Sequence, residues 1–251
     1  MDDKTLLRPG DIATALALLS RLPLRARFER GADAAWAYPL AGPVLALIAA
    51  LPTALLLSVG LPAPLAALVW LALHVVLTGA MHEDGLADSA DGLWGGWEPA
   101  RRLEIMKDSR IGSYGVIALC LSLAARWAAL GLLLAEPGWL WGLVAVGALS
   151  RATMPALMAA LPHARASGLS RAQGRPSRTT ALVAAAIALA LALLCSGAAA
   201  AALAAVAALV ALACAGIARA KIGGQTGDIL GATQQVAEIA LLFTLTLWSA
   251  G

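Results

Sequence analysis

Residues 62–92 read PAPLAALVWLALHVVLTGAMHEDGLADSADG, an apolar run followed at once by an acidic one. The apolar part, residues 62–82, matches the roughly 20 helical residues that cross a hydrocarbon core of about 30 Å. Four carboxylates then follow within residues 83–91. The stretch therefore predicts a membrane helix with a cluster of acidic side chains at its end.

Other apolar runs of similar length fill most of the chain. Hydrophobic residues make up 61% and charged residues 13% of the sequence, whereas a soluble domain has roughly half and a quarter. We expect an all-α, polytopic transmembrane helix bundle of about seven spans, forming a single domain over residues 1–251. The predicted spans lie near residues 38–59, 62–82, 111–135, 138–161, 179–196, 198–218 and 229–250.

The first part of the chain has a different character. Residues 11–24 are apolar, but they are few and Pro23 interrupts them, so we expect an N-terminal interfacial or re-entrant helix here. Residues 1–10 carry charges, and the apolar region and cleavage site of a signal peptide do not follow them. No cleaved signal is expected.

The 18 Lys and Arg residues are distributed unevenly. Those outside the predicted spans lie before the first span and in every second connection between spans. They precede the first span, with Lys4 among them, and recur in 83–110, in 162–178 and at Arg219 and Lys221. Cationic loops face the cytoplasm. This pattern predicts the N-terminus and the acidic cluster at the cytoplasmic face of the cell (inner) membrane. It also explains the net charge of +3 without a nucleic-acid partner.

The acidic cluster has helical spacing. If the helix continues, Asp84, Asp88 and Asp91 share one face at positions i, i+4 and i+7. Like charges on one face repel, whereas Mg²⁺ binds carboxylates, water and substrate phosphates. Glu83 points off this face as an outer ligand, and His82 beside it is a candidate ligand or proton acceptor. The alternative is a solvated acidic loop neutralised by nearby cations.

A second polar segment, residues 223–232, reads GGQTGDILGA. Gly224 and Gly227 would let the backbone approach a phosphate closely, and a helix that starts near Asp228 would point free N–H groups at an anion. Thr226 lies between these glycines. The glycine pattern alone also fits a flexible turn. Asp228 and Glu238 are ionisable groups at a membrane helix, and such groups are usually functional or paired.

Basic residues offer further candidates. Lys107 and Arg110 would share a helical face and could grip a pyrophosphate, although they also fit an ordinary cationic flank. His163 and Arg165 lie in a predicted cytoplasmic loop, where they either contact a substrate or are solvated. Two arginines lie inside apolar runs and must pair or face a polar cavity; they are Arg126 and Arg151.

Three motifs together resemble the cobalamin synthase family in their order and spacing. They are HEDGLADSADG at 82–92, RLEIMKDSRIG at 102–112 and GQTGDILGA at 224–232. The resemblance covers most of the chain, and Met81 and Ser89 depart slightly from the family pattern. It implies a multi-pass membrane enzyme that transfers the cobinamide phosphate group of adenosylcobinamide-GDP to alpha-ribazole or its 5'-phosphate. The products are adenosylcobalamin, or its 5'-phosphate, and GMP.

The resemblance also implies roles for the candidate residues. Mg²⁺ would be held by carboxylates, Lys107 and Arg110 would clamp the diphosphate, and Asp91 or His82 would be the general base. The expected metal ligands are Asp84, Asp88, Asp91 and Asp228, with Glu83 behind them. The expected substrate-binding residues are Lys107, Arg110, His163, Arg165, Gly224, Thr226 and Gly227.

Other functions compete with this reading. A CDP-alcohol phosphotransferase also holds Mg²⁺ on a helix, but it carries further spaced aspartates that this chain lacks. An aromatic prenyltransferase needs two Asp-rich motifs, whereas residues 223–238 contain one Asp. A transporter would place its carboxylates near the midplane of the bilayer rather than at one face. We expect the lipid bilayer to surround the protein, and the sequence does not determine whether the chain forms a homo-oligomer.

Overall fold

The computed structural model describes residues 6–249, so Lys4 lies outside the described residues. These residues form helices and connections with no β-strand, apart from an isolated parallel bridge between His163 and Gln225. Within residues 6–249, six helices are long and apolar enough to cross a membrane. They are α2 (Tyr38–Ser58, continuous with the 3₁₀ helix η1 at Gly31–Ala37), α6 (Ser113–Leu133), α7 (Trp139–Ala160), α9 (Arg178–Ser196), α10 (Ala199–Ile222) and α11 (Gly227–Ser249).

A seventh candidate span is broken in two. Helices α3 (Ala63–Thr78) and α4 (Met81–Gly95) pass the same test together, but they meet at an angle of 86°. The predicted multi-pass, all-helical fold is therefore confirmed. The shorter helices are α1 (Gly10–Leu19), α5 (Pro99–Ile105) and α8 (Leu169–Gln173). The 10 residues of α1 rise about 15 Å, which is half of a hydrocarbon core.

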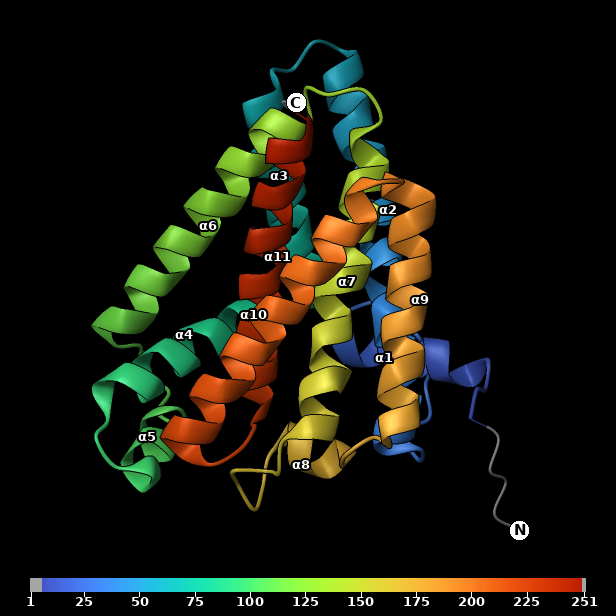
Figure 1. Cartoon of the computed structure of the whole chain (residues 1–251). Coiled ribbons are helices and arrows are strands. Elements are labelled where there is room, and N and C mark those ends of the chain that lie inside the picture. Colours follow the sequence, from blue (N-terminus) through green and yellow to red (C-terminus); the bar gives the residue numbers. More distant parts are fainter. Residues whose placement is uncertain (1–5, 250–251) are drawn as a thin grey trace.

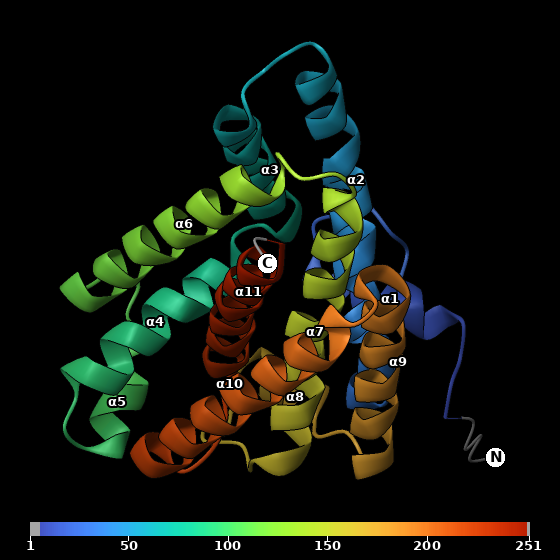
Figure 2. The same cartoon turned by 45° about the horizontal axis from the view of Figure 1, so that its top comes forward.

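The break between α3 and α4 corrects the expectation of one helix over residues 62–82. Gly79 and Ala80 both adopt left-handed backbone conformations, with φ of 63° and 57°, and this conformation ends a right-handed helix. The acidic motif therefore lies on a helix of its own, which runs away from α3 and lies beside α6 and α11 (Figure 2). The turn changes which way the carboxylates face without changing their helical spacing.

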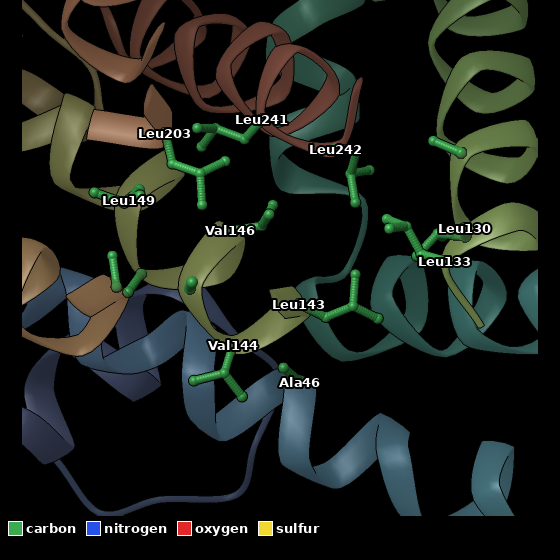
Figure 3. Close-up of a cluster of buried hydrophobic side chains, with 14 of the residues drawn as sticks. Ala46, Leu130, Leu133, Leu143, Val144, Val146, Leu149, Leu203, Leu241 and Leu242 are labelled. Carbon is green, nitrogen blue, oxygen red and sulfur yellow. The ribbon is translucent and has the colours of Figure 1, made fainter. Parts of the chain in front are cut away.

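Helix α7 is the most buried of the candidate spans and forms the centre of the bundle. It packs against α2, α9 and α11, and Figure 3 shows leucine and valine side chains from α7 meeting those of α6, α10 and α11. Gly42 on α2 faces Gly147 on α7, where a Cβ on Gly42 would overlap the Gly147 carbonyl. Small residues of this kind let membrane helices approach closely.

The connections gather at two ends of the bundle. In Figure 1, α4, α5, α8 and the α10–α11 connection lie toward the lower end, whereas the α2–α3 and α6–α7 connections lie at the upper end. The lower end carries the Lys- and Arg-rich segments 99–110 and 163–178. The structure thus places the cationic connections on the same side as the acidic motif, and we call this side the cation-rich end.

Candidate active site

A cavity of about 230 Å³ opens at the cation-rich end. Helices α4 and α11 and the connection between α7 and α9 contribute most of its polar lining. Its charged and polar lining includes His82, Asp84, His163, Arg165, Ser170, Arg171, Gln225, Thr226 and Asp228. Segments far apart in the sequence therefore meet around one cavity, and most of them were singled out by motif.

Two glycines bring α4 and α11 together. A Cβ on Gly85 would lie 2.9 Å from the carbonyl oxygen of Asp228, and a Cβ on Gly231 would lie 3.3 Å from the Cα of His82. The first distance is shorter than any real Cβ contact, so Gly85 is required where the acidic motif crosses the start of α11. This crossing places Asp84 and Asp228 at the same cavity.

The carboxylates differ in exposure and in partners. Asp84 is exposed, whereas Asp88 and Asp228 are half-buried. Asp88 lies within electrostatic range of Asp84 and Asp228, so these carboxylates repel one another. Arg165 Nη1 lies 2.9 Å from Asp228 Oδ2 and offsets part of this negative charge. The cavity thus combines carboxylates with guanidinium groups, because Arg171 lines it as well as Arg165.

Helix α11 begins at the cavity, as the sequence predicted. Its first residue is Gly227, and Thr226 caps it because the Ile229 N–H donates to Thr226 Oγ1 at 3.3 Å. The Thr226 hydroxyl donates to Asp228 Oδ2 at 3.2 Å. The first N–H groups of a helix have no acceptor within the helix, and here they lie beside a cavity suited to an anion.

The connection after α7 is bound directly to the connection before α11. Gln225 donates its backbone N–H to the Pro162 carbonyl at 2.8 Å, and Ala164 donates to the Gln225 carbonyl at 2.9 Å. The Gln225 side chain lies 2.9 Å from His163 Nδ1 and accepts from Ser170 Oγ at 2.6 Å. Gly224 is also fixed here, because a Cβ would overlap the Pro162 carbonyl. These contacts hold Arg165 beside Asp228.

His163 therefore supports the cavity wall through Gln225. Partial burial lowers the pKa of His163 below its usual value of 6.5, and the charges of Arg171 and Arg175 act in the same direction. Sequence reasoning did not identify Gln225, Ser170 or Arg171 as part of the site. A glutamine within the glycine motif was the available signal, because buried amides normally have partners.

His82 lies on the wall of the cavity with its side chain buried. Its Nε2 atom has no hydrogen-bond partner among residues 6–249. Buried polar atoms are normally satisfied, so an unpaired imidazole nitrogen beside a cavity is suited to accept a proton or a hydrogen bond from a bound molecule. The structure thus places His82 at the cavity, and its role as a ligand or proton acceptor stays a prediction.

Asp91 occupies a different environment from the other two aspartates of α4. Its Oδ2 accepts from the Gly112 N–H at 2.7 Å, and its Oδ1 accepts from the Gly115 N–H at 2.9 Å. Asp91 is buried and does not line the cavity. Helical spacing suggested a metal ligand and the family resemblance a general base, but in this structure the Asp91 carboxylate binds the N-terminus of α6 instead of facing the cavity.

Lys107 and Arg110 do not share a helical face, because α5 ends at Ile105. Arg110 instead forms an exposed ion pair with Asp108, with Nη2 to Oδ2 at 2.8 Å. Hydrogen bonds from Arg110 lower the pKa of Asp108 to about 2. Neither cation lines the cavity, so the predicted diphosphate clamp is not assembled in this structure.

The outer carboxylate and the buried arginines form a separate cluster. Glu83 Oε1 lies 3.0 Å from Arg126 Nη1, inside the bundle rather than at the cavity. Arg126 Nη1 also lies 3.6 Å from Glu238 Oε1. The expectation that Arg126 and Glu238 need partners within the membrane is confirmed, whereas Glu83 is not placed beside Asp84 as a ligand.

The donor set of the cavity suits a hard cation that shares its ligands with a substrate. Among the described residues, no three His, Cys, Asp or Glu side chains meet closely enough to hold a metal ion on their own. Mg²⁺ usually takes only one or two carboxylates and completes its shell with water and substrate phosphates. Asp84 and Asp228 fit that requirement, because they line the cavity from two different helices, and Asp88 lies within electrostatic range of both.

Comparisons with known proteins bear on this site. Residues 11–246 match the protein family described as cobalamin-5-phosphate synthase. The chain belongs to this family. Proteins of Mesorhizobium japonicum and Bradyrhizobium diazoefficiens, both named adenosylcobinamide-GDP ribazoletransferase, are 45% and 44% identical to it. The alignments cover 94% and 96% of this chain and 93% and 95% of the relatives.

A third relative with the same name, from Sinorhizobium medicae, is 43% identical over 94% of this chain and 96% of its own length. No solved structure matches the chain. Membership of the cobalamin-5-phosphate synthase family decides against the CDP-alcohol phosphotransferase, prenyltransferase and transporter readings. The resemblance seen in the three motifs is confirmed across nearly the whole sequence.

Proposed function

We propose that this member of the cobalamin-5-phosphate synthase family is an adenosylcobinamide-GDP ribazoletransferase. It transfers the cobinamide phosphate group from adenosylcobinamide-GDP to alpha-ribazole or its 5'-phosphate. A ribose hydroxyl oxygen forms a new bond to the phosphorus that is esterified to cobinamide. The bond from that phosphorus to the bridging oxygen breaks, and the bridging oxygen leaves with GMP. The hydroxyl proton passes to a base.

One observation carries the proposal: a guanidinium, a helix N-terminus and carboxylates of two helices line one cavity. Arg165 and the first turn of α11 attract a diphosphate, whereas Asp84 and Asp228 would repel it without a cation between them. A diphosphate carried with a divalent cation satisfies both groups. Neither a neutral substrate nor a bare anion does so.

Different residues would bind the cation, bind the phosphoryl group and accept the proton. Asp84, Asp88 and Asp228 would hold Mg²⁺, which when bound supplies positive charge to the phosphoryl oxygens. Arg165 would bind a phosphoryl oxygen once the substrate competes for its contact with Asp228. His82, whose Nε2 has no partner among residues 6–249, is the base that accepts the hydroxyl proton. A base acts only within hydrogen-bond reach of the proton, so His82 must face the ribose.

The cavity is too small to enclose the whole substrate. Its volume of about 230 Å³ falls below the several hundred Å³ that enclose a drug-sized ligand. The cavity therefore takes the diphosphate and part of its neighbours, while the corrin ring remains outside. This arrangement requires an opening to the side that supplies both substrates, and the Lys- and Arg-rich connections at this end support a cytoplasmic opening.

The test is GMP release from adenosylcobinamide-GDP and alpha-ribazole 5'-phosphate by the protein purified into lipid vesicles. Wild-type protein should release GMP with Mg²⁺ and not with EDTA, and Asp84→Asn should lose at least about 100-fold of the rate. Absence of GMP with Mg²⁺ present would overturn the activity. GMP release that Asp84→Asn leaves intact would keep the activity and refute this placement of the cation.

A further inference from the structure

The interior of the bundle holds an ion cluster that the proposed reaction does not use. The Arg126 side chain on α6 is 1% exposed, and its Nη1 faces Glu83 at 3.0 Å and Glu238 at 3.6 Å. Glu83 also accepts from Gln235 Nε2 at 3.4 Å, and Glu238 accepts from Gln234 Nε2 at 2.6 Å. One guanidinium nitrogen thus joins carboxylates from two other helices.

Those two helices are the ones that carry the candidate cation site. Glu83 immediately precedes Asp84 on α4, and Glu238 lies on α11, whose first turn contains Asp228. A displacement of either glutamate would move a carboxylate of the cavity with it, because a helix transmits a shift along its axis. Arg126 is therefore placed to control the separation between the two halves of the site.

A second contact makes α6 a rigid support. Asp91 binds the Gly112 and Gly115 N–H groups at the start of α6, while Glu83 binds Arg126 farther along the same helix. Helix α4 is thereby attached to α6 at two points, on either side of Asp84 and Asp88 in the sequence. Two attachment points fix the rotation of α4 as well as its position.

We propose that Arg126 is a positioning residue for the candidate cation site, holding α4 and α11 in register through Glu83 and Glu238. This inference rests on the proposed function, because it assigns the cation to Asp84, Asp88 and Asp228. Arg126 does not line the cavity. Its effect is on how tightly the cation is bound, as expected of residues that orient ligands from behind.

A purely structural role makes a different prediction. Buried charges must be balanced, so any change that removes the Arg126 charge would damage the bundle whatever Arg126 positions. Arg126→Lys separates the two roles, because lysine keeps the charge but its ammonium falls short of the Nη1 position by about one bond length. The charge balance survives while the contact to Glu83 and Glu238 lengthens.

Arg151 provides a matched control within the same bundle. Its side chain is also buried, but its Nη1 donates at 3.3 Å to the Gly147 carbonyl of its own helix, α7. Arg151 acts on Glu83 and Glu238 only through longer-range electrostatics, so Arg151→Lys makes the same chemical change and keeps the charge without altering a hydrogen bond or ion pair to a carboxylate of α4 or α11. Any general effect of placing lysine in the interior appears in both variants.

The experiment measures Mn²⁺ binding by electron paramagnetic resonance, with GMP present, on full-length protein in lipid, and the Mg²⁺ dependence of GMP release. Arg126→Lys should weaken Mn²⁺ binding and raise the half-saturating Mg²⁺ by about 10- to 100-fold, with the rate at saturating Mg²⁺ affected less. Arg151→Lys should match the wild type. Glu238→Gln removes one partner of Arg126 and should also weaken Mn²⁺ binding. If Arg126→Lys fails to fold, the Mn²⁺ affinity of Glu238→Gln tests the inference instead.

Wild-type Mn²⁺ affinity in a folded Arg126→Lys protein would overturn the inference, as would an equal loss in Arg151→Lys. A wild-type protein that binds no Mn²⁺ would overturn it too. The wild type could bind Mn²⁺, and the variants could show the expected affinities, without any release of GMP. That result would overturn the proposed reaction and leave the positioning role of Arg126 intact. The two conclusions are thus separated by the binding measurement.

Discussion

Arg165 and Asp228 form an ion pair, with Nη1 2.9 Å from Oδ2, that joins the connection after α7 to the first turn of α11. Both side chains are largely buried, with exposed fractions of 12% and 21%. Burial strengthens such a pair relative to one in water. Asp84 also lines the cavity, and Asp88 lies within electrostatic range of Asp84 and Asp228, so Arg165 offsets part of a larger negative charge at the site.

Replacing Arg165 by glutamine should therefore weaken binding of the anionic substrate. The loss of one charged hydrogen-bond donor should raise the KM for adenosylcobinamide-GDP by roughly 10- to 150-fold, while kcat falls less. Steady-state GMP release against substrate concentration measures the effect. Arg178→Gln, at an exposed position that does not line the cavity, is the control, and an equal rise in KM in that variant would mean that only overall charge matters.

Asp88 should show a conflict between stability and activity. It repels Asp84 and Asp228, so Asp88→Asn should raise the free energy of unfolding by about 0.5–2 kcal/mol in EDTA while turnover with Mg²⁺ is lost. Thermal unfolding in EDTA and GMP release with Mg²⁺ test the two halves. Asp33→Asn, exposed on η1, should change neither, and a less stable Asp88→Asn protein would contradict the repulsion.

Asp91→Asn should behave in the opposite way, because both Asp91 oxygens accept backbone hydrogen bonds. An asparagine amide would place a donor against one of these N–H groups, at a cost of about 1–3 kcal/mol in the free energy of unfolding. Thermal unfolding measures this loss. A variant with wild-type stability that has lost turnover at saturating Mg²⁺ would instead make Asp91 the metal ligand suggested by its spacing or the base implied by the family resemblance.

The spans could be predicted from sequence because the bilayer dictates them. A membrane helix must satisfy its backbone internally and cover about 30 Å, so the apolar runs near 38–59 and 138–161 match α2 and α7 closely. The turn at Gly79 and Ala80 could not be predicted in the same way. It depends on the N-terminal segment, since the Arg21 N–H donates to the Leu77 carbonyl at 2.7 Å and the Arg21 side chain packs on Gly79.

The site was only partly predictable for a related reason. Helical spacing correctly put Asp84, Asp88 and Asp91 on one face of a helix, but spacing does not reveal what the neighbouring helices offer. Asp91 meets the N-terminus of α6, whereas Asp84 faces the cavity with Asp228. The role of Gln225 was hidden because it arises from a docking of two connections that are distant in sequence.

The His163–Gln225 contact predicts a pH dependence of stability. Because the pKa of His163 is lowered on folding, mainly by burial, the unfolded chain binds a proton more readily than the folded protein. Stability is thus unaffected well above pH 6.5 and falls as the pH drops below that value. Protonation at Nδ1 would also place a donor against Gln225 Nε2, 2.9 Å away.

His163→Gln should therefore reduce the fall in melting temperature between neutral pH and about pH 5.5. Melting temperatures of the two proteins in the same lipid and buffers give the comparison. All other histidines are common to both proteins, so the difference between the two slopes reports on His163. Identical slopes would show that His163 does not contribute to acid sensitivity.

Gly42→Ala should loosen the centre of the bundle. A Cβ on Gly42 would overlap the Gly147 carbonyl, so α2 and α7 must separate to admit it, at a cost of about 1–3 kcal/mol in the free energy of unfolding. Gly216→Ala in α10 is the control, because a Cβ there meets no atom within 4 Å and alanine favours a helix over glycine by roughly 0.5–1 kcal/mol. Thermal unfolding should rank the proteins with Gly216→Ala at or above the wild type and Gly42→Ala below it; an unchanged Gly42→Ala protein would mean that the two helices can move apart without loss.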